Sequence, residues 1–228
     1  MIKHLLLDLD DTLLDFRASE KVALTKALIK MKVEPTPTLL SRYSVINRGY
    51  WERLERGEIT RARLLVDRFA DLFSEFSVSA DPARMQDSYE GYHALGYTFV
   101  DGAKELLDTL VDTYTLWIAS NGNAKVQESR IVGSGISSYF SGIFISEQIG
   151  ADKPSAAFYD ACFARMGDAR REETVMVGDS LTSDIRGGAA AGLRTVWYNP
   201  RRLPCPDGLS PTAEIHRLSD LPAALKRI

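Results

Sequence analysis

Short runs of apolar residues recur along the chain, and each run is followed by a segment with helical spacing of its apolar positions. The runs are nearly continuous in apolar residues, which is typical of strands in a parallel sheet that is buried on both faces. They lie at residues 4–7, 115–119, 143–145, 174–177 and 195–197. Helices are expected at residues 102–112, 124–133, 155–166 and 183–191. The pattern predicts an α/β fold, with a Rossmann-like parallel sheet and helices on both of its faces.

One long interval, residues 17–96, breaks this alternation. It shows helical periodicity, as in Leu24 and Leu28 or Phe69 and Phe73, but no convincing strand. About four helices fit, which is too many for a single crossover between neighbouring strands. We therefore expect an all-helical cap at residues 17–96, inserted into an α/β core made of residues 1–16 and 97–228. The tail of the core leaves room for an edge strand at residues 214–217 and a last helix.

The composition is that of an ordinary globular protein, with 45% hydrophobic and 26% charged residues. A net charge of -3 and scattered arginines disfavour a nucleic acid polymer as partner. No apolar stretch approaches the ~20 residues of a membrane span, and the N-terminus lacks a signal-peptide pattern. The two isolated cysteines, Cys162 in a helical pattern and Cys205 in a loop, suit neither a disulfide framework nor a zinc site. A cytoplasmic location is therefore expected.

Two acids, Asp8 and Asp10, stand at the end of the first expected strand. Side chains alternate along a strand, so residues two apart lie on the same side, about 6.6 Å apart at a rise of ~3.3 Å per residue. Two carboxylates can therefore converge on one bound group. Taken alone, the pair fits equally well as acids in a solvated turn, or as an N-cap for the next helix.

Two further strand ends carry a hydroxyl and a lysine. Ser120, followed by Asn121 and Gly122, can supply side-chain and backbone donors to phosphate oxygens, although an ordinary N-cap also explains it. Lys153 precedes Pro154, which suits the first turn of the following helix and would anchor the lysine. A lone lysine is more commonly a solvated surface charge.

A second acidic turn, Gly178-Asp179-Ser180 with Asp184 further on, follows the fourth expected strand. Oxygen ligands of this kind suit a hard cation, although a turn and a helix cap would use the same residues. Because parallel strands bind ligands at their carboxyl ends, all four features are expected at one edge of the sheet. Together they offer acids, a hydroxyl and a lysine, which is the equipment of phosphoryl transfer.

In this order the four features resemble the motifs of the haloacid dehalogenase superfamily of hydrolases. The matching segments are Asp8-Leu9-Asp10-Asp11-Thr12, Ser120, Lys153, and Gly178-Asp179-Ser180 with Asp184. The resemblance spans residues 2–199, and the helical insertion after the first motif resembles the helical (C1-type) cap of this superfamily. It implies a phosphatase that acts on a small-molecule phosphate ester and requires Mg²⁺.

The resemblance also implies the roles of individual acids. Asp8 is the expected nucleophile, which becomes an aspartyl-phosphate, and Asp10 is the expected general acid and then base. Carboxylate oxygens of Asp8 and Asp179, with the backbone carbonyl of Asp10, are the expected Mg²⁺ ligands. Asp184 is expected to support the metal shell, directly or through water, and Thr12 to orient the loop and Asp10.

Three residues are implied in binding the phosphoryl group. The hydroxyl of Ser120 and the amide of Asn121 are expected to hold phosphoryl oxygens. Lys153 is expected to offset the negative charge of both the phosphate and the nucleophile, so that two anions can approach each other.

Other activities on the same core stay open. A halide leaves without protonation, and the resemblance implies that dehalogenases lack an acid at the position of Asp10 and need no Mg²⁺. Because this chain has both Asp10 and the second acidic turn, a phosphatase is favoured over a 2-haloacid dehalogenase. A sugar-phosphate phosphomutase would differ only in what accepts the phosphoryl group from Asp8. A binding protein with a relic site is disfavoured, because each motif position holds a competent residue.

The cap resembles that of the pyrimidine 5'-nucleotidase branch of the superfamily. The cap segments that carry this likeness are Asn47-Arg48-Gly49-Tyr50-Trp51, residues 56–60 and Arg68-Phe69. The core segments that carry it are Ser120-Asn121-Gly122, Gln127, Arg130, Tyr139-Phe140 and Ser146-Glu147. Asn47, Trp51 and Arg68 on adjacent helical faces can stack on and hydrogen-bond a nucleobase. Alternatively, Trp51 and Phe69 pack the core of the cap while Arg68 snorkels over it. The resemblance implies a nucleoside 5'-monophosphate as substrate.

Overall fold

The computed structural model describes all 228 residues. Its internal contacts divide the chain into two compact units, one made of residues 1–16 and 98–228 and the other of residues 17–97. The first unit contains all six strands, and the second contains helices only. No helix in the chain is both long enough and apolar enough to cross a membrane.

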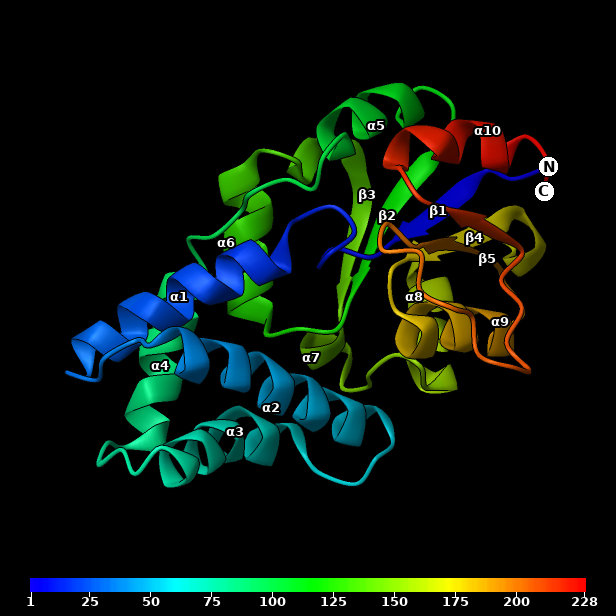
Figure 1. The fold of residues 1–228 in the computed structure, drawn as a ribbon. Helices are drawn as coiled ribbons and strands as arrows, with labels where there is room; N and C mark the ends of the chain where they lie inside the picture. Colours follow the sequence, from blue (N-terminus) through cyan, green and yellow to red (C-terminus); the bar gives the residue numbers. More distant parts are fainter. The chain divides into compact units, whose positions relative to one another are not determined.

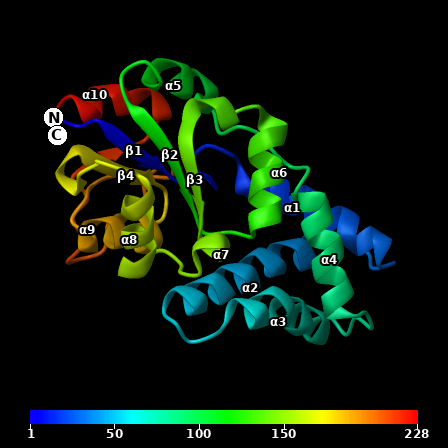
Figure 2. The ribbon, with the colours of Figure 1, turned by 180° about the vertical axis from the view of Figure 1, so that it is seen from behind.

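The first unit is built on a six-stranded sheet with the strand order β3-β2-β1-β4-β5-β6. All neighbouring strands are parallel, so the predicted parallel α/β fold is confirmed. Figure 2 shows β3, β2, β1 and β4 side by side. The strands are β1 (His4–Leu7), β2 (Thr115–Ser120), β3 (Phe140–Ile145), β4 (Thr174–Gly178), β5 (Arg194–Tyr198) and β6 (Ala213–Ile215).

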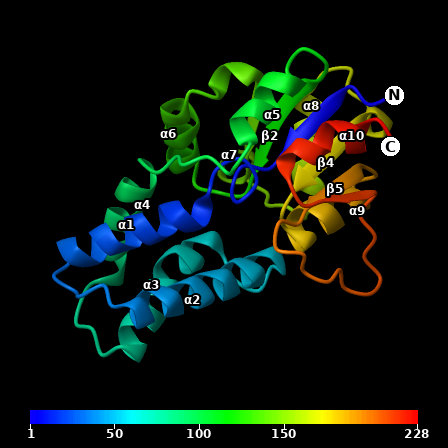
Figure 3. The same ribbon diagram turned by 45° about the horizontal axis from the view of Figure 1, so that its top comes forward.

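Helices cover both faces of this sheet. Alternate side chains of β1 point to opposite faces: Leu5 and Leu7 pack with α5 and α10, whereas Leu6 packs with α8. Figure 1 shows α5 and α10 on one face and α8 and α9 on the other, and Figure 3 shows α5 and α10 next to each other. The helices are α5 (Ala103–Leu110), α6 (Ala124–Ser134), α7 (Ser146–Ile149), α8 (Ala156–Arg165), α9 (Gly187–Ala190) and α10 (Leu221–Leu225).

Two elements begin two or more residues before their expected starts. β3 begins at Phe140, three residues before the expected start at residue 143, because it is an edge strand whose first half is partly exposed and therefore breaks the apolar pattern. The helix expected at residues 183–191 begins earlier, as a π-helical stretch at Leu181–Arg186 that continues into α9. Ser180 caps this stretch by accepting a hydrogen bond from the backbone N–H of Ser183.

The second unit consists of the helices α1 to α4. They span Phe16–Lys30, Pro37–Glu55, Arg61–Glu75 and Pro82–His93, in line with the four helices expected. Thr36, Thr60 and Asp81 cap the N-termini of α2, α3 and α4 with their side chains. The apolar faces meet in one buried cluster, in which the rings of Tyr43 and Phe69 stack 5.1 Å apart.

Arg68 lies inside this helical unit rather than snorkelling over its core. Its guanidinium donates hydrogen bonds to Asn47 Oδ1 at 2.6 Å and to Gln86 Oε1 at 2.7 Å. Asn47 in turn donates to Glu20 Oε1 at 2.7 Å. The snorkelling interpretation is therefore wrong: buried acceptors, together with neighbouring aromatic rings, compensate the guanidinium for its lost water. Phe69, in contrast, packs the core of the unit as expected.

Candidate active site

The loop after β1 sets the positions of the first two acids. Asp8 follows the strand directly and is buried, whereas Asp10 is partly exposed. The loop closes tightly, because the carbonyl of Leu9 accepts a hydrogen bond from the N–H of Leu13 at 2.9 Å. Asp11 adopts a left-handed backbone with φ of 56°, which aspartate tolerates better than most residues. Neither Asp8 nor Asp10 caps a helix, so the N-cap interpretation of this pair is wrong.

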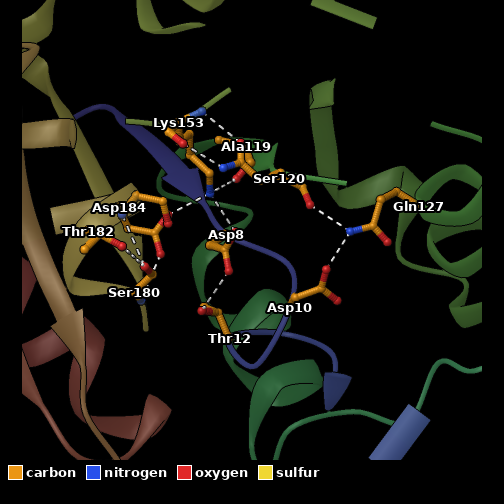
Figure 4. A network of polar contacts seen from close by, with 12 residues as sticks. Asp8, Asp10, Thr12, Ala119, Ser120, Gln127, Lys153, Ser180, Thr182 and Asp184 are labelled. Carbon is orange, nitrogen blue, oxygen red and sulfur yellow. Dashed lines mark hydrogen bonds and ion pairs between the residues drawn. The ribbon is translucent and has the colours of Figure 1, made fainter. Parts of the chain in front are cut away.

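Lys153 is the centre of a buried polar cluster at the carboxyl ends of the strands (Figure 4). Its ammonium donates to Asp8 Oδ1 and to Asp184 Oδ1, both at 2.7 Å, and to the carbonyl of Ala119 at 2.6 Å. Three acceptors match the three N–H groups of an ammonium. The surface-charge interpretation of Lys153 is therefore wrong, and the lysine joins the ends of three strands or their following turns.

A reciprocal pair of hydrogen bonds fixes the backbone of Lys153. Asn121 Oδ1 accepts from the backbone N–H of Lys153 at 2.9 Å, and Asn121 Nδ2 donates to the carbonyl of Lys153 at 2.8 Å. The sequence predicts Asn121 only as a donor to phosphoryl oxygens. This structural role of its side chain was not expected, although asparagine commonly bonds backbone groups in turns. Pro154 was expected in the first turn of the following helix. It lies before the helix, because Ser155 is the N-cap and α8 begins at Ala156.

The second acidic turn is packed against the end of β4. Asp184 is fully buried, and its Oδ2 accepts a hydrogen bond from the backbone N–H of Ser180 at 3.1 Å. A Cβ atom at Gly178 would lie 2.2 Å from this carboxylate, so only glycine leaves room for it. The carbonyl of Asp179 accepts from the indole N–H of Trp197 at 3.0 Å. The residue that caps the following helical stretch is Ser180, so neither Asp179 nor Asp184 is the helix cap.

Three carboxylates from these two loops could hold a metal ion. Asp8, Asp179 and Asp184 each offer one oxygen, and these oxygens lie within 4.8 Å of one another. Oxygen donors at this spacing fit a hard divalent cation such as Mg²⁺. The carboxylate of Asp10 is not among them.

The electrostatics of the cluster also fit a cation. The pKa of Asp8 is raised to about 8, chiefly by burial and also by the neighbouring Asp184 carboxylate, against the lowering effect of the Lys153 ammonium. Burial acts to lower the pKa of Lys153, but the carboxylates of Asp184 and Asp8 outweigh it and raise this pKa above its ordinary value. One lysine thus faces two buried acids, Asp8 and Asp184, and a bound cation would balance the remaining negative charge.

Asp10 points away from this cluster and toward α6. Its Oδ1 accepts from Arg130 Nη1 at 2.5 Å, and its Oδ2 accepts from Gln127 Nε2 at 2.7 Å. Thr12 was expected to orient Asp10. Its hydroxyl instead donates a hydrogen bond to Asp8 Oδ2 at 3.3 Å and so orients the first acid. The likeness to the nucleotidase branch includes Gln127 and Arg130 but implies no role for them. Their spacing of three places both on one helix face.

Ser120 ends β2 and is buried. Its Oγ accepts from Gln127 Nε2 at 2.8 Å (Figure 4). The N-cap of α6 is Asn123, which accepts from the N–H of Val126, so the N-cap interpretation of Ser120 is wrong. The structure therefore brings Asp8, Lys153 and the acidic turn into one cluster. Ser120 and Asp10 are linked to each other by Gln127 of α6, which donates a hydrogen bond to each.

The fold and this arrangement define a family. The chain matches the model of the haloacid dehalogenase-like hydrolases over residues 2–192. It therefore belongs to the haloacid dehalogenase-like hydrolase family, and the resemblance seen in its motifs is confirmed.

Individual relatives cover almost the whole chain. The chain is 40% identical over 220 residues to the pyrimidine 5'-nucleotidase PynA of Streptococcus pneumoniae, with 96% of this chain and 93% of that protein covered. It is 29% identical over 214 residues to the pyrimidine 5'-nucleotidase YjjG of Escherichia coli, with 94% and 93% covered. The crystal structure of the HAD-hydrolase YfnB of Bacillus subtilis, bound to magnesium, matches with a TM-score of 0.95 and 36% identity, covering 98% of both chains.

Proposed function

We propose that this hydrolase is a Mg²⁺-dependent phosphatase that cleaves small phosphate monoesters through an aspartyl-phosphate, with pyrimidine nucleoside 5'-monophosphates as its preferred substrates. The observation that carries the proposal is the position of Asp8, a buried carboxylate that contacts Lys153 and lies beside the acids of the second turn. The named activity of two relatives supports the choice of substrate.

In the first step, Asp8 attacks phosphorus in line with the leaving alcohol. A bond forms between a carboxylate oxygen of Asp8 and phosphorus, the ester P–O bond breaks, and the leaving oxygen takes a proton from Asp10. In the second step, water attacks the aspartyl-phosphate, Asp10 takes a proton from this water, and inorganic phosphate leaves Asp8. Asp10 is thus protonated again at the end of each cycle.

The surrounding residues lower the barrier by holding charge in place. Ser120 and the backbone amide of Asn121 bind phosphoryl oxygens, and the ammonium of Lys153 stabilises the negative charge that gathers near Asp8. Because its three N–H groups are already engaged, Lys153 acts mainly through its charge. Mg²⁺, held by carboxylates of Asp8 and Asp179 and the backbone carbonyl of Asp10, would supply further positive charge to the phosphoryl oxygens.

A panel of phosphate esters tests the substrate class. With Mg²⁺ present, we expect kcat/KM for phosphate release from pyrimidine nucleoside 5'-monophosphates to exceed that from sugar phosphates and phosphoglycolate. A panel in which no nucleotide is among the better substrates contradicts the nucleotidase proposal. Chloride release from a 2-haloacid without Mg²⁺ would identify a dehalogenase, and formation of an isomeric phosphosugar without free phosphate would identify a phosphomutase.

Unfolding with and without Mg²⁺ tests the metal site. A ligand that binds only the folded state at 100 times its dissociation constant raises the free energy of unfolding by about 2.7 kcal/mol, and we expect Mg²⁺ to do so. Asp179→Asn removes one charged ligand, so a higher Mg²⁺ concentration should be needed to reach the same increase in the free energy of unfolding. The matched control is Asp112→Asn, an exposed aspartate after α5. Equal Mg²⁺ responses of the two variants would place the ion elsewhere.

A further inference from the structure

Two buried side chains of α6 contact the site without belonging to any of its four motifs. Arg130 is fully buried and Gln127 nearly so, and they lie three residues apart on one face of the helix. Arg130 Nη1 donates to Gln127 Oε1 at 2.7 Å and to Asp10 Oδ1 at 2.5 Å. Gln127 Nε2 donates to Asp10 Oδ2 at 2.7 Å and to Ser120 Oγ at 2.8 Å. Figure 4 shows the Gln127 amide between Ser120 and Asp10.

The hydrogen-bond network determines which way the Gln127 amide faces. A guanidinium only donates, so the atom of Gln127 that faces Arg130 has to be the carbonyl oxygen. The NH₂ group then faces the site, and its two N–H groups reach one acceptor each, on Ser120 and on Asp10. Because the Ser120 oxygen accepts from Gln127, its own proton is directed elsewhere and can be donated to a phosphoryl oxygen.

The backbone of the second motif leaves space for this amide. A Cβ atom at Gly122 would lie 2.7 Å from Gln127 Cγ and 2.8 Å from its Nε2, so a larger residue there would displace the glutamine. Burying a guanidinium and an amide is costly unless both are paired. Here the partner of both is Asp10, whose side chain is 25% exposed and which carries the proton in the proposed mechanism.

We propose that Gln127 and Arg130 are positioning residues that hold the Asp10 carboxyl for proton transfer to the leaving oxygen, with Gln127 also orienting the Ser120 hydroxyl. This inference rests on the proposed function. Each carboxyl oxygen of Asp10 has a second lone-pair site beside the bond it accepts, so the transferred proton can be carried there. The two residues touch neither substrate nor metal in this scheme and act only through Asp10 and Ser120.

The test compares two leaving groups. p-Nitrophenolate leaves without a proton, whereas the 5'-oxygen of uridine 5'-monophosphate requires one, so only the second substrate depends on a well-placed acid. For Arg130→Met we expect kcat/KM for the nucleotide to fall about 10- to 100-fold, as when a general acid is misplaced, and kcat/KM for p-nitrophenyl phosphate to change by less than about 3-fold. The ratio of the two values does not depend on how much of the variant is folded.

Two more variants distinguish positioning from a structural role. A single nitrogen of Arg130, Nη1, makes both bonds, so the ammonium of Arg130→Lys should restore most of the nucleotide activity. Gln127→Ala should show the same selective loss, with an added loss on both substrates because Ser120 loses its donor. Lys125→Ala, at an exposed position of α6, should match the wild type.

The possible outcomes separate this inference from the proposed function. A wild-type enzyme that hydrolyses neither ester with Mg²⁺ overturns the proposed function, and the inference with it. A wild-type enzyme that hydrolyses both, with Arg130→Met and Gln127→Ala losing equal factors on the two esters or losing nothing, overturns the inference alone. Selective loss on the nucleotide, with rescue by Arg130→Lys, supports it.

Discussion

Asp8→Asn is expected to lower kcat for phosphate release by about 10⁴-fold or more, which is the scale of loss when a covalent nucleophile is removed. The amide nitrogen and oxygen of asparagine cannot form a stable bond to phosphorus. No phosphorylated protein should therefore be trapped when the variant is mixed with substrate and quenched in acid. Steady-state phosphate release and mass spectrometry of the quenched protein measure the two effects.

The loss in Asp8→Asn should not come from unfolding. In the metal-free protein, burial raises the pKa of Asp8 to about 8, so its ionisation opposes folding. The stability that the protonated form provides is present below the unfolded-state pKa of about 3.9 and is lost as the pH rises toward the folded value. A neutral asparagine removes this loss, and the Lys153 ammonium keeps the Asp184 carboxylate as its ion-pair partner. We therefore expect the metal-free variant to unfold no more easily than the wild type at pH 7. Asp112→Asn, on the surface, serves as the control, and unchanged turnover in Asp8→Asn would refute the mechanism.

The strands and their order along the chain could be predicted because parallel strands buried on both faces leave a continuous apolar signal. Four of the five expected strands agree with the structure to within one residue at each end. The start of β3 was missed because only one side of an edge strand is paired and its first residues are partly exposed, with Ser141 and Gly142 interrupting the pattern.

The cluster at the strand ends could also be anticipated, since the topology of a parallel sheet brings those ends to one edge. This topology is enough to predict that Lys153 lies near Asp8, as it does in the structure. The topology does not predict which side chains bond to Asp10, because that depends on how α6 is rotated against the sheet. The same limit applies to Arg68, whose burial depends on the packing of three helices and not on its neighbours in sequence.

Lys153→Met should cause the second large loss, and in this case both stability and activity fall. The substitution keeps an unbranched side chain of similar length but leaves the Asp8 and Asp184 carboxylates facing each other without the ammonium between them. Removing one partner of a buried ion pair typically costs about 3–5 kcal/mol. Because the folded-state pKa of Lys153 is raised, its stabilising effect is complete at any pH below about 10.4, so neutral pH measures the whole loss.

The proposed metal site gives the Lys153→Met variant a further, distinctive property. Mg²⁺ bound beside Asp8 and Asp184 would replace part of the missing positive charge, so it should raise the free energy of unfolding more in Lys153→Met than in the wild type. Activity should stay about 10²- to 10³-fold low even with saturating Mg²⁺, because transition-state charge near Asp8 still lacks a fixed cation. Urea unfolding and phosphate release with and without Mg²⁺ measure these effects, with Lys125→Met as the exposed control. An equal Mg²⁺ response in the variant and the wild type would mean that the lysine and the ion do not share the same carboxylates.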